Sequence, residues 1–159
     1  MNDRDYSLRV RAMERRLYRI SRAILFNDAD CADAIQEAVF RGWMKKGSLR
    51  DEALFETWII RILINECRNI LRKRKIAPLP LENAIIAGTD APDEGLHLRQ
   101  ALSRLPEKYR MPLLLHHLEG YGLADIARML DLPQPLVKSR LHQARGALRR
   151  ILNAGGENA

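Results

Sequence analysis

The stretch from Ile76 to Leu98 divides the chain into two parts of different character. It contains three prolines, two glycines and four acidic residues, but neither Lys nor Arg. Proline removes a backbone donor and glycine loosens the chain, so such a stretch is typical of a linker rather than of a helix or a strand. We therefore predict two small domains, over residues 1–75 and 96–159, joined by an acidic, Pro-containing linker over residues 76–95.

Apolar residues recur at helical spacing in the first part of the chain. They predict one helix through Val10, Met13, Leu17, Ile20 and Ile24, a second through Ile35, Val39 and Trp43, and a third from Phe55 through Ile62 and Leu71 into the basic end "LRKRK". The side chains of "NDAD" are suited to cap the second helix, and "KKGSLRDEAL" reads as a polar loop before the third. We expect the aromatic residues Trp43, Phe55 and Trp58 to pack in the core, because aromatics at helical spacing more often pack there than stack on a ligand.

The second part of the chain also shows helical spacing. A helix through Leu98 and Leu105 is closed by Pro106, and an apolar run then leads into "EGYG". Pro112 falls within what reads as one helix, so we expect a kink there or a late helix start near Met111. Neither part shows the alternation of a strand, and the predicted fold class is all-α.

The charge of the chain favours a polyanionic partner. Lys and Arg number 27 against 20 for Asp and Glu, and the formal net charge is +7. Such a balance suits nucleic acid or an anionic membrane surface. The charged start "MNDRDYSLRV" lacks the apolar run of a secretory signal, and we expect a cytoplasmic protein.

The stretch "LADIARMLDLPQPLVKSRLHQARGAL" has the outline of a helix-turn-helix, in which the second helix enters the DNA major groove. Pro135 marks the start of that second helix. At about 100° per residue, Val137, Leu141, Ala144 and Leu148 fall on one side, which we expect to pack inward. The residues then predicted to meet DNA are Leu136, Lys138, Ser139, Arg140, Gln143, Arg145 and Arg149. The alternative is a solvated basic helix of a bundle.

The sequence shows no arrangement of residues typical of a catalytic or metal-binding site. His116 and His117 are adjacent rather than one helical turn apart, and Cys31 and Cys67 lie in no ligand spacing, so we read both cysteines as buried apolar residues. No nucleophile with a base and no phosphate-cradling glycine loop is evident. We expect no catalytic residue, no metal, no cofactor and no small-molecule substrate, and hence a protein that is not an enzyme.

Several motifs resemble those of the extracytoplasmic-function (ECF) group of bacterial RNA polymerase sigma factors. "DCADAIQEAVFRGW" looks like the acidic polymerase-binding helix of that family, and "FETWIIRILINECRNILRKRK" looks like its F-x-x-W-L-x-x-I-x-x-N helix with a basic tail. "ALSRLPEKYRMPLLLHHLEGYGLADIARMLDLPQPLVKSRLHQARGAL" resembles its L-P…E-G…I-A…V-K-S-R-L…A-R…L signature. Their order and spacing cover most of the chain.

The resemblance implies a subunit that binds core RNA polymerase, recognises the minus-ten and minus-thirty-five promoter elements, and helps to melt promoter DNA. It implies polymerase binding by Asp33, Gln36 and Glu37. It also implies that the minus-ten element and its melted strand are contacted by Arg61, Asn65, Arg68, Arg72 and Arg74. The arginines among them would suit the phosphates of single-stranded DNA. The helix-turn-helix would read the minus-thirty-five element, and an anti-sigma factor is an expected partner.

The chain departs from the family pattern in the region that would read DNA. Asn69 stands where many members have Asp, and Asp131 replaces a turn glycine. Pro135 and Leu136 replace a Gly-Thr pair, and Gln143 replaces Arg, so the promoter sequence of relatives does not carry over. The alternative function is a stand-alone helix-turn-helix regulator, which would bind duplex DNA tightly without polymerase and would carry a self-complementary dimer interface.

Overall fold

The structure, a computed structural model, describes residues 1–74 and 93–157, and within them every regular element is helical. The first part comprises α1 (Asp3–Ala12), α2 (Glu14–Leu25), α3 (Asp28–Lys45), the short 3-10 helices η1 (Lys46–Ser48) and η2 (Glu52–Leu54), and α4 (Phe55–Arg74). The second comprises α5 (Asp93–Ser103), α6 (Glu107–Leu113), the π-helical η4 (Leu114–Leu118), α7 (Leu123–Leu130) and α8 (Gln134–Glu157). The predicted all-α class and the helix-turn-helix are confirmed.

Most of the predicted linker over residues 76–95, namely residues 76–92, lies outside the described residues. The helix α5 begins at Asp93, three residues before the predicted start of the second domain.

Side-chain caps define the starts of α1 and α3. The Asn2 side chain accepts a hydrogen bond from the Asp5 amide at 2.8 Å, and the Asn27 side chain accepts one from the Asp30 amide at 3.1 Å. The caps satisfy amides that have no partner inside the helix. Capping by "NDAD" is thus confirmed for Asn27.

Two helix boundaries differ from the sequence prediction. The single helix predicted from Val10 to Ile24 is broken at Met13, whose backbone (φ −101°, ψ 1°) is not helical and whose side chain is buried. Of the two alternatives predicted for Pro112, a kink or a late helix start near Met111, the late start is wrong, because the helix starts at Glu107. Proline cannot donate to the preceding turn, and directly after Pro112 and Leu113 the helix changes to the π-helical segment η4.

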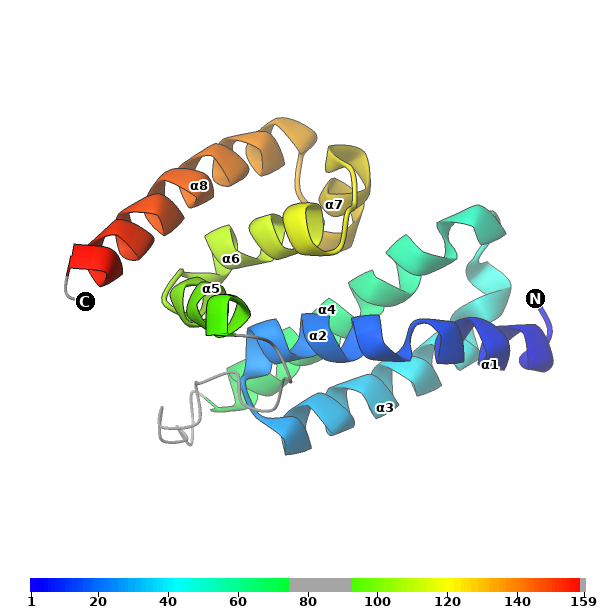
Figure 1. Cartoon of the computed structure of the whole chain (residues 1–159). Helices are drawn as coiled ribbons and strands as arrows, with labels where there is room; N and C mark the ends of the chain where they lie inside the picture. The colour runs from blue at the N-terminus through cyan, green and yellow to red at the C-terminus, as the bar shows by residue number, and fades with distance from the viewer. Residues whose placement is uncertain (75–92, 158–159) are drawn as a thin grey trace.

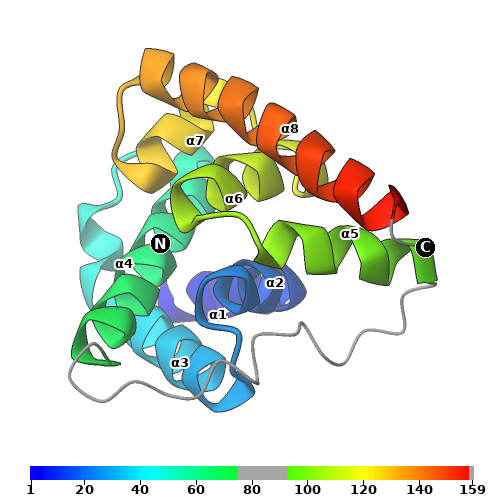
Figure 2. The same ribbon diagram turned by 90° about the vertical axis from the view of Figure 1, so that its left-hand side faces the viewer.

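The two groups of helices pack against each other in one body (Figure 1). In the first group α3 and α4 pack together and α2 packs on both, and in the second α8 packs on α5, α6 and α7. Across the groups α7 lies against α4, and α6 lies against α2. Figure 2 shows that α6 and α7 lie between α8 and the first group, so α8 is the outermost helix on that side.

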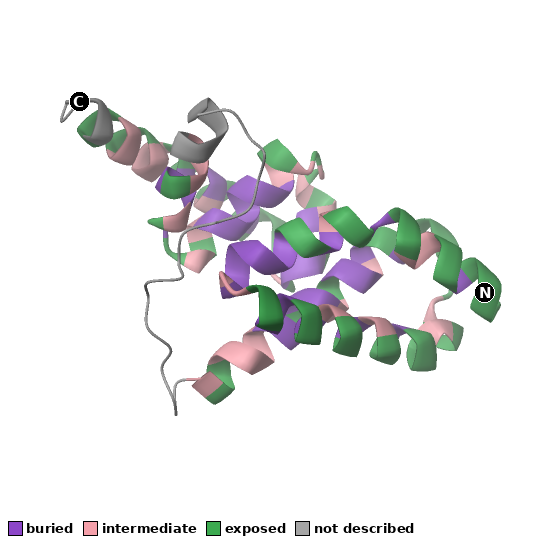
Figure 3. Ribbon diagram, turned by 60° about the horizontal axis from the view of Figure 1, so that its bottom comes forward, coloured by how far each residue is buried: buried purple, intermediate pink, exposed green. Residues whose placement is uncertain are grey.

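The buried apolar side chains of the two groups form one continuous core. Figure 3 shows buried residues on the inner faces of the helices and exposed residues along the outer faces of the ribbons. The largest fully buried side chains of this core include Leu17, Ile59 and Leu63 from the first group and Met111 and Ile126 from the second. None of the described helices is long and apolar enough to cross a membrane.

Candidate nucleic-acid interface

The helix α8 divides into a buried side and a solvent-facing side, as its periodicity predicts. Val137, Leu141 and Ala144 are buried, whereas Ser139 and Gln143 are exposed. The other candidate DNA contacts on this helix are also accessible: Leu136, Lys138, Arg145 and Arg149 are exposed, and Arg140 is half-buried. A polar face at the start of the second helix of a helix-turn-helix is what major-groove reading requires.

The turn before α8 is built on Asp131. Its backbone is left-handed (φ 56°, ψ 51°), a conformation that Asp tolerates better than most residues. The amide of Leu132 then donates to the carbonyl of Ala127 at 2.9 Å. Asp131 is therefore the left-handed residue on which the turn between α7 and α8 is built.

Arg145 and Arg149 lie on the side of α8 that borders α5 and η4. With Leu98, Leu118 and Leu148 they line an apolar groove of about 390 Å³. Arg145 Nε donates to His117 Nε2 at 3.2 Å, and burial, with the nearby Arg145 charge, lowers the pKa of His117. These two arginines thus lie beside the polar face that contains Gln143 rather than within it.

Four of the five candidate single-strand contacts form one stripe along α4. Arg61, Asn65, Arg68 and Arg72 are spaced by four, three and four residues, which places them on one face of a helix. Three of them, Asn65, Arg68 and Arg72, line a groove of about 510 Å³ with Glu107 from the start of α6. We call these four residues the α4 stripe.

Arg74 is not part of the α4 stripe. Two residues beyond Arg72, it lies about 200° farther round the helix, and it forms an ion pair with Asp30 of α3. Arg74 therefore lies off the face of the α4 stripe, as helical spacing alone shows, although it lines the groove between α3 and the end of α4 together with Arg72.

The candidate polymerase-binding residues share an exposed face of α3. Asp33, Gln36 and Glu37 are all exposed, and the two acids line a groove of about 690 Å³ between α3 and the end of α4. Arg41 Nε lies 3.1 Å from Glu37 and 3.0 Å from Glu66 across this groove. The exposed face of α3 is thus acidic at Asp33 and Glu37, and the Arg41 guanidinium lies beside Glu37.

Sequence reasoning missed the apolar continuation of this face. Phe40 and Met44 are 53% and 66% exposed, and they follow Asp33, Gln36 and Glu37 at helical spacing. Trp43, expected in the core, is 43% exposed, whereas Phe55 is buried and Trp58 is half-buried. The prediction for Trp43 is therefore wrong. Polar contacts hold this side chain at the surface, because its indole donates to Asp3 at 2.9 Å and the Lys46 ammonium lies over its ring.

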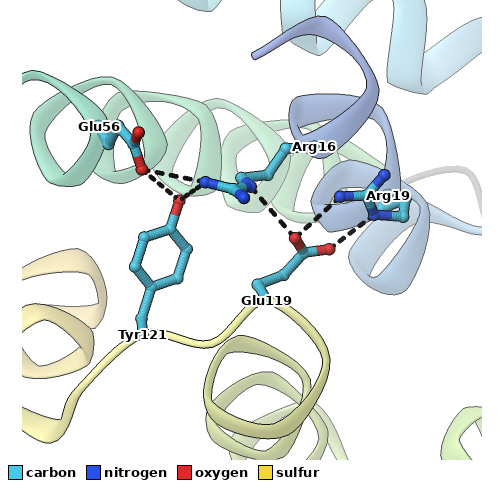
Figure 4. A network of polar contacts seen from close by, with 5 residues as sticks. All are labelled: Arg16, Arg19, Glu56, Glu119 and Tyr121. Carbon is cyan, nitrogen blue, oxygen red and sulfur yellow. Dashed lines mark hydrogen bonds and ion pairs between the residues drawn. The ribbon is translucent and has the colours of Figure 1, made fainter. Parts of the chain in front are cut away.

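A polar network joins the two groups of helices (Figure 4). Glu119, in the loop after η4, accepts from Arg19 Nε and Nη2 at 2.7 and 2.9 Å and lies 3.3 Å from Arg16 Nε. The Tyr121 hydroxyl donates to Glu56 at 3.0 Å and accepts from Arg16 at 2.9 Å. Burial, and then the hydrogen bond to Glu56, raise the pKa of Tyr121.

Arg110 reinforces the same junction from α6. It is buried, and its guanidinium donates to the carbonyls of Ala23 and Leu105, each at 2.6 Å. The same group lies 4.7 Å from the centroid of the Phe26 ring. Burial lowers the pKa of Arg110. A charge buried in this way needs several partners to offset its lost hydration.

The two cysteines are fully buried, as the sequence predicts. Burial raises the pKa of both thiols. In the part of the chain that the structure describes, no three His, Cys, Asp or Glu side chains come together as a metal site would require.

Comparison with known proteins places both halves of the chain in one family. The model of Sigma-70 region 2 matches residues 9–76, and that of Sigma-70, region 4 matches residues 96–148. The ECF RNA polymerase sigma factor SigM of Mycobacterium tuberculosis is 34% identical over 145 residues, which are 89% of this chain and 74% of that protein. The match of residues 9–76 to region 2 is not expected of a stand-alone helix-turn-helix regulator, and that alternative is not favoured.

Two solved structures share the fold. The sigma factor RpoE of Bartonella quintana, in complex with the anti-sigma factor NepR, has a TM-score of 0.82 at 21% identity and covers 94% of this chain and 97% of its own. CnrH, in complex with the cytosolic domain of CnrY, has a TM-score of 0.74 at 24% identity, with 96% and 90% covered. The helical architecture, the two matched regions and the relation to SigM establish that this chain belongs to the ECF RNA polymerase sigma factors.

Proposed function

We propose that this chain binds core RNA polymerase through the exposed face of α3 that contains Asp33, Gln36 and Glu37. Acidic side chains beside the exposed apolar Phe40 and Met44 suit a partner surface that is basic and partly apolar. The partner class and the three residues come from the family resemblance, and the exposure of these residues on one face supports the proposal.

The α4 stripe is proposed to hold the melted strand of the minus-ten element. Three arginines and an asparagine on one face give phosphate contacts with regular spacing along a rigid helix. Arg74, which pairs with Asp30 on the other side of α4, is proposed to support that helix end rather than to contact the strand.

The exposed face of α8 is proposed to read the duplex of the minus-thirty-five element. Arg140 and Gln143 have the donors and acceptors to pair with base edges, and Leu136 offers an apolar contact. Lys138, Arg145 and Arg149 are proposed to position the helix on phosphates.

An anti-sigma factor is a proposed further partner, since the similar sigma factor RpoE is bound by the anti-sigma factor NepR, and the similar CnrH is bound by the cytosolic domain of CnrY. The chain is proposed to act in the cytoplasm, with polymerase. It has a recognition role and no catalytic role in this proposal, and it takes neither cofactor nor metal.

One observation carries the proposal. The helices of one chain present an exposed acidic face on α3, the cationic α4 stripe and an exposed polar face on α8. The test is equilibrium binding of the intact chain to purified core polymerase, comparing Asp33→Asn/Glu37→Gln with the matched control Asp5→Asn/Glu14→Gln. Both pairs remove two exposed carboxylates, but the control pair lies on α1 and α2. We expect the α3 pair to weaken binding by about tenfold or more and the control pair by little. Equal effects of the two pairs would refute the assignment of the α3 face.

A further inference from the structure

Gln143 lies on α8, which is the outermost helix on its side of the molecule (Figure 2). The packing side of α8 consists of three buried residues, Val137, Leu141 and Ala144. At about 3.6 residues per turn, the direction opposite to these three passes between Ser139 and Gly146, and Gln143 lies about 50° away from it. The Gln143 side chain therefore points away from the helices on which α8 packs.

The neighbours of Gln143 on this outward face are small. Ser139 lies one turn before it and Gly146 one turn after it, and a Cβ added at Gly146 meets no described atom within 4 Å. Packing therefore does not require a glycine there, and glycine lowers the stability of a helix interior relative to alanine. With only a hydroxymethyl group and a hydrogen atom on either side, α8 can approach a partner closely, and the Gln143 carboxamide projects beyond both neighbours.

The Gln143 carboxamide is free to bind a partner. The side chain is exposed, and it makes no hydrogen bond with any other residue that the structure describes. Its backbone is held in place, since Leu141 and Ala144 on either side are 2% and 0% exposed. A free polar group on a fixed backbone is what recognition of one particular base requires.

We infer that Gln143 reads an adenine in the duplex of the minus-thirty-five element, through two hydrogen bonds in the major groove. The carboxamide N–H donates to adenine N7, and the carboxamide oxygen accepts from the adenine N6 amino group. The inference rests on the proposed function of α8. It adds the identity of a base to that function, because adenine is the base whose major-groove edge has an acceptor beside a donor.

The other three bases match the carboxamide less well. Guanine presents two acceptors, N7 and O6, so one of them would face the Gln143 oxygen without a proton between them. Cytosine presents a donor without the N7 acceptor, and thymine presents one acceptor beside a methyl group. A single neutral side chain can thus distinguish adenine from all three.

The test uses the full-length chain assembled with core polymerase, and promoter duplexes whose upstream element is randomised. Sequencing of the bound fraction gives the base preference at each position. The wild-type chain is expected to enrich adenine at one position by about fivefold or more over each other base. In Gln143→Arg the preference at that position is expected to change to guanine, because a guanidinium donates to both O6 and N7.

The variant Gln100→Arg is the matched control. It makes the same chemical change at an exposed glutamine of α5, outside the proposed DNA-reading face. Its base preferences are expected to match those of wild type at every position.

A second measurement tests the atoms involved. An adenine analogue in which a carbon replaces N7 is placed at the enriched position, and its binding is compared with that of adenine. The wild-type chain is expected to lose about fivefold or more in affinity, because the Gln143 N–H loses its acceptor. Gln143→Ala is expected to bind both duplexes equally. Equal losses in the two proteins would refute the assigned hydrogen bonds.

The outcomes separate this inference from the proposed function. If no position of the upstream element shows a base preference, the proposed function of α8 fails and the inference fails with it. If preferences exist but Gln143→Arg changes none of them, the proposed function stands and the inference is refuted. It is refuted likewise if the position that Gln143→Arg alters favours a base other than adenine in wild type.

Discussion

Arg19 and Glu119, 100 residues apart in the sequence, form a two-point ion pair with N to O distances of 2.7 and 2.9 Å. The Glu119 side chain is only 2% exposed, whereas that of Arg19 is 48% exposed. In the sequence, Glu119 is only the first residue of "EGYG" after an apolar run. In the folded chain this carboxylate joins the loop after η4 to α2 and, through Arg16, to the hydrogen bonds of Tyr121 and Glu56.

Replacement of Glu119 by Gln is expected to lower the free energy of unfolding by about 1–3 kcal/mol, because a charged acceptor of several hydrogen bonds is lost while Arg16 and Arg19 remain. Denaturant unfolding measures the effect. Glu14→Gln, which removes an exposed carboxylate from α2, is the control and is expected to change stability by about 0.5 kcal/mol or less. A similar loss in both variants would contradict the assigned role of Glu119.

Arg110 tests the buried part of the same junction. Arg110→Met keeps most of the side-chain volume but leaves the carbonyls of Ala23 and Leu105 without their donor, so we expect a loss of about 2–4 kcal/mol in unfolding free energy. Arg110→Lys is expected to recover little of this, because a single ammonium group cannot reproduce two directed bonds and the stacking on Phe26. Wild-type stability in Arg110→Met would show that the guanidinium is dispensable.

Gly42 tests the packing of α3 against α1 and α4. A Cβ at this position would lie 2.5 Å from Tyr6 Oη and 2.8 Å from Ile59 Cδ1, and the Tyr6 hydroxyl is already fixed by its hydrogen bond to the Val39 carbonyl. Gly42→Ala is therefore expected to cost about 1–3 kcal/mol of stability through overpacking. Gly47→Ala is the matched control, because a Cβ there meets no described atom within 4 Å. Thermal melts in which both variants match wild type would disprove the close contact.

The two sides of α8 predict different effects on DNA binding. Gln143→Ala, on the exposed polar face, is expected to change preference at the upstream element by about 1–3 kcal/mol for a base in contact. Arg149→Ala, which borders the apolar groove, is expected to weaken binding to all sequences and to reduce its salt dependence.

Binding of a set of upstream-element duplexes at two salt concentrations measures both effects on α8. Equal losses on every sequence for both variants would show that the faces of α8 are wrongly assigned.

Local pattern predicted most of the helices and the recognition face. The apolar spacing of α8 identified Val137, Leu141 and Ala144 as its packing side, and the α4 stripe follows from the same periodicity. The break at Met13 was not predictable in this way, because the apolar spacing continues through it.

The contacts between the domains could not be predicted from the sequence, for a different reason. The Arg19 pair with Glu119 and the Arg110 bond to Ala23 join residues that are distant in sequence, and a charged residue at either end is also typical of a solvated surface. Their partners follow only from the packing of α6 and α7 against α2 and α4. The exposure of Trp43 was missed because its partners, Asp3 and Lys46, come from outside its own helix.

Run-off transcription with purified core polymerase and a library of promoters tests most directly whether the three surfaces act together in promoter-specific initiation. We expect transcripts from defined start sites on promoters that share two separated elements, and a loss of about tenfold or more in their yield with Arg61→Ala/Arg68→Ala. The variant Asp5→Asn/Glu14→Gln is expected to start at the same sites with nearly wild-type yield. A transcript pattern that is the same with the chain as with core polymerase alone would contradict the account.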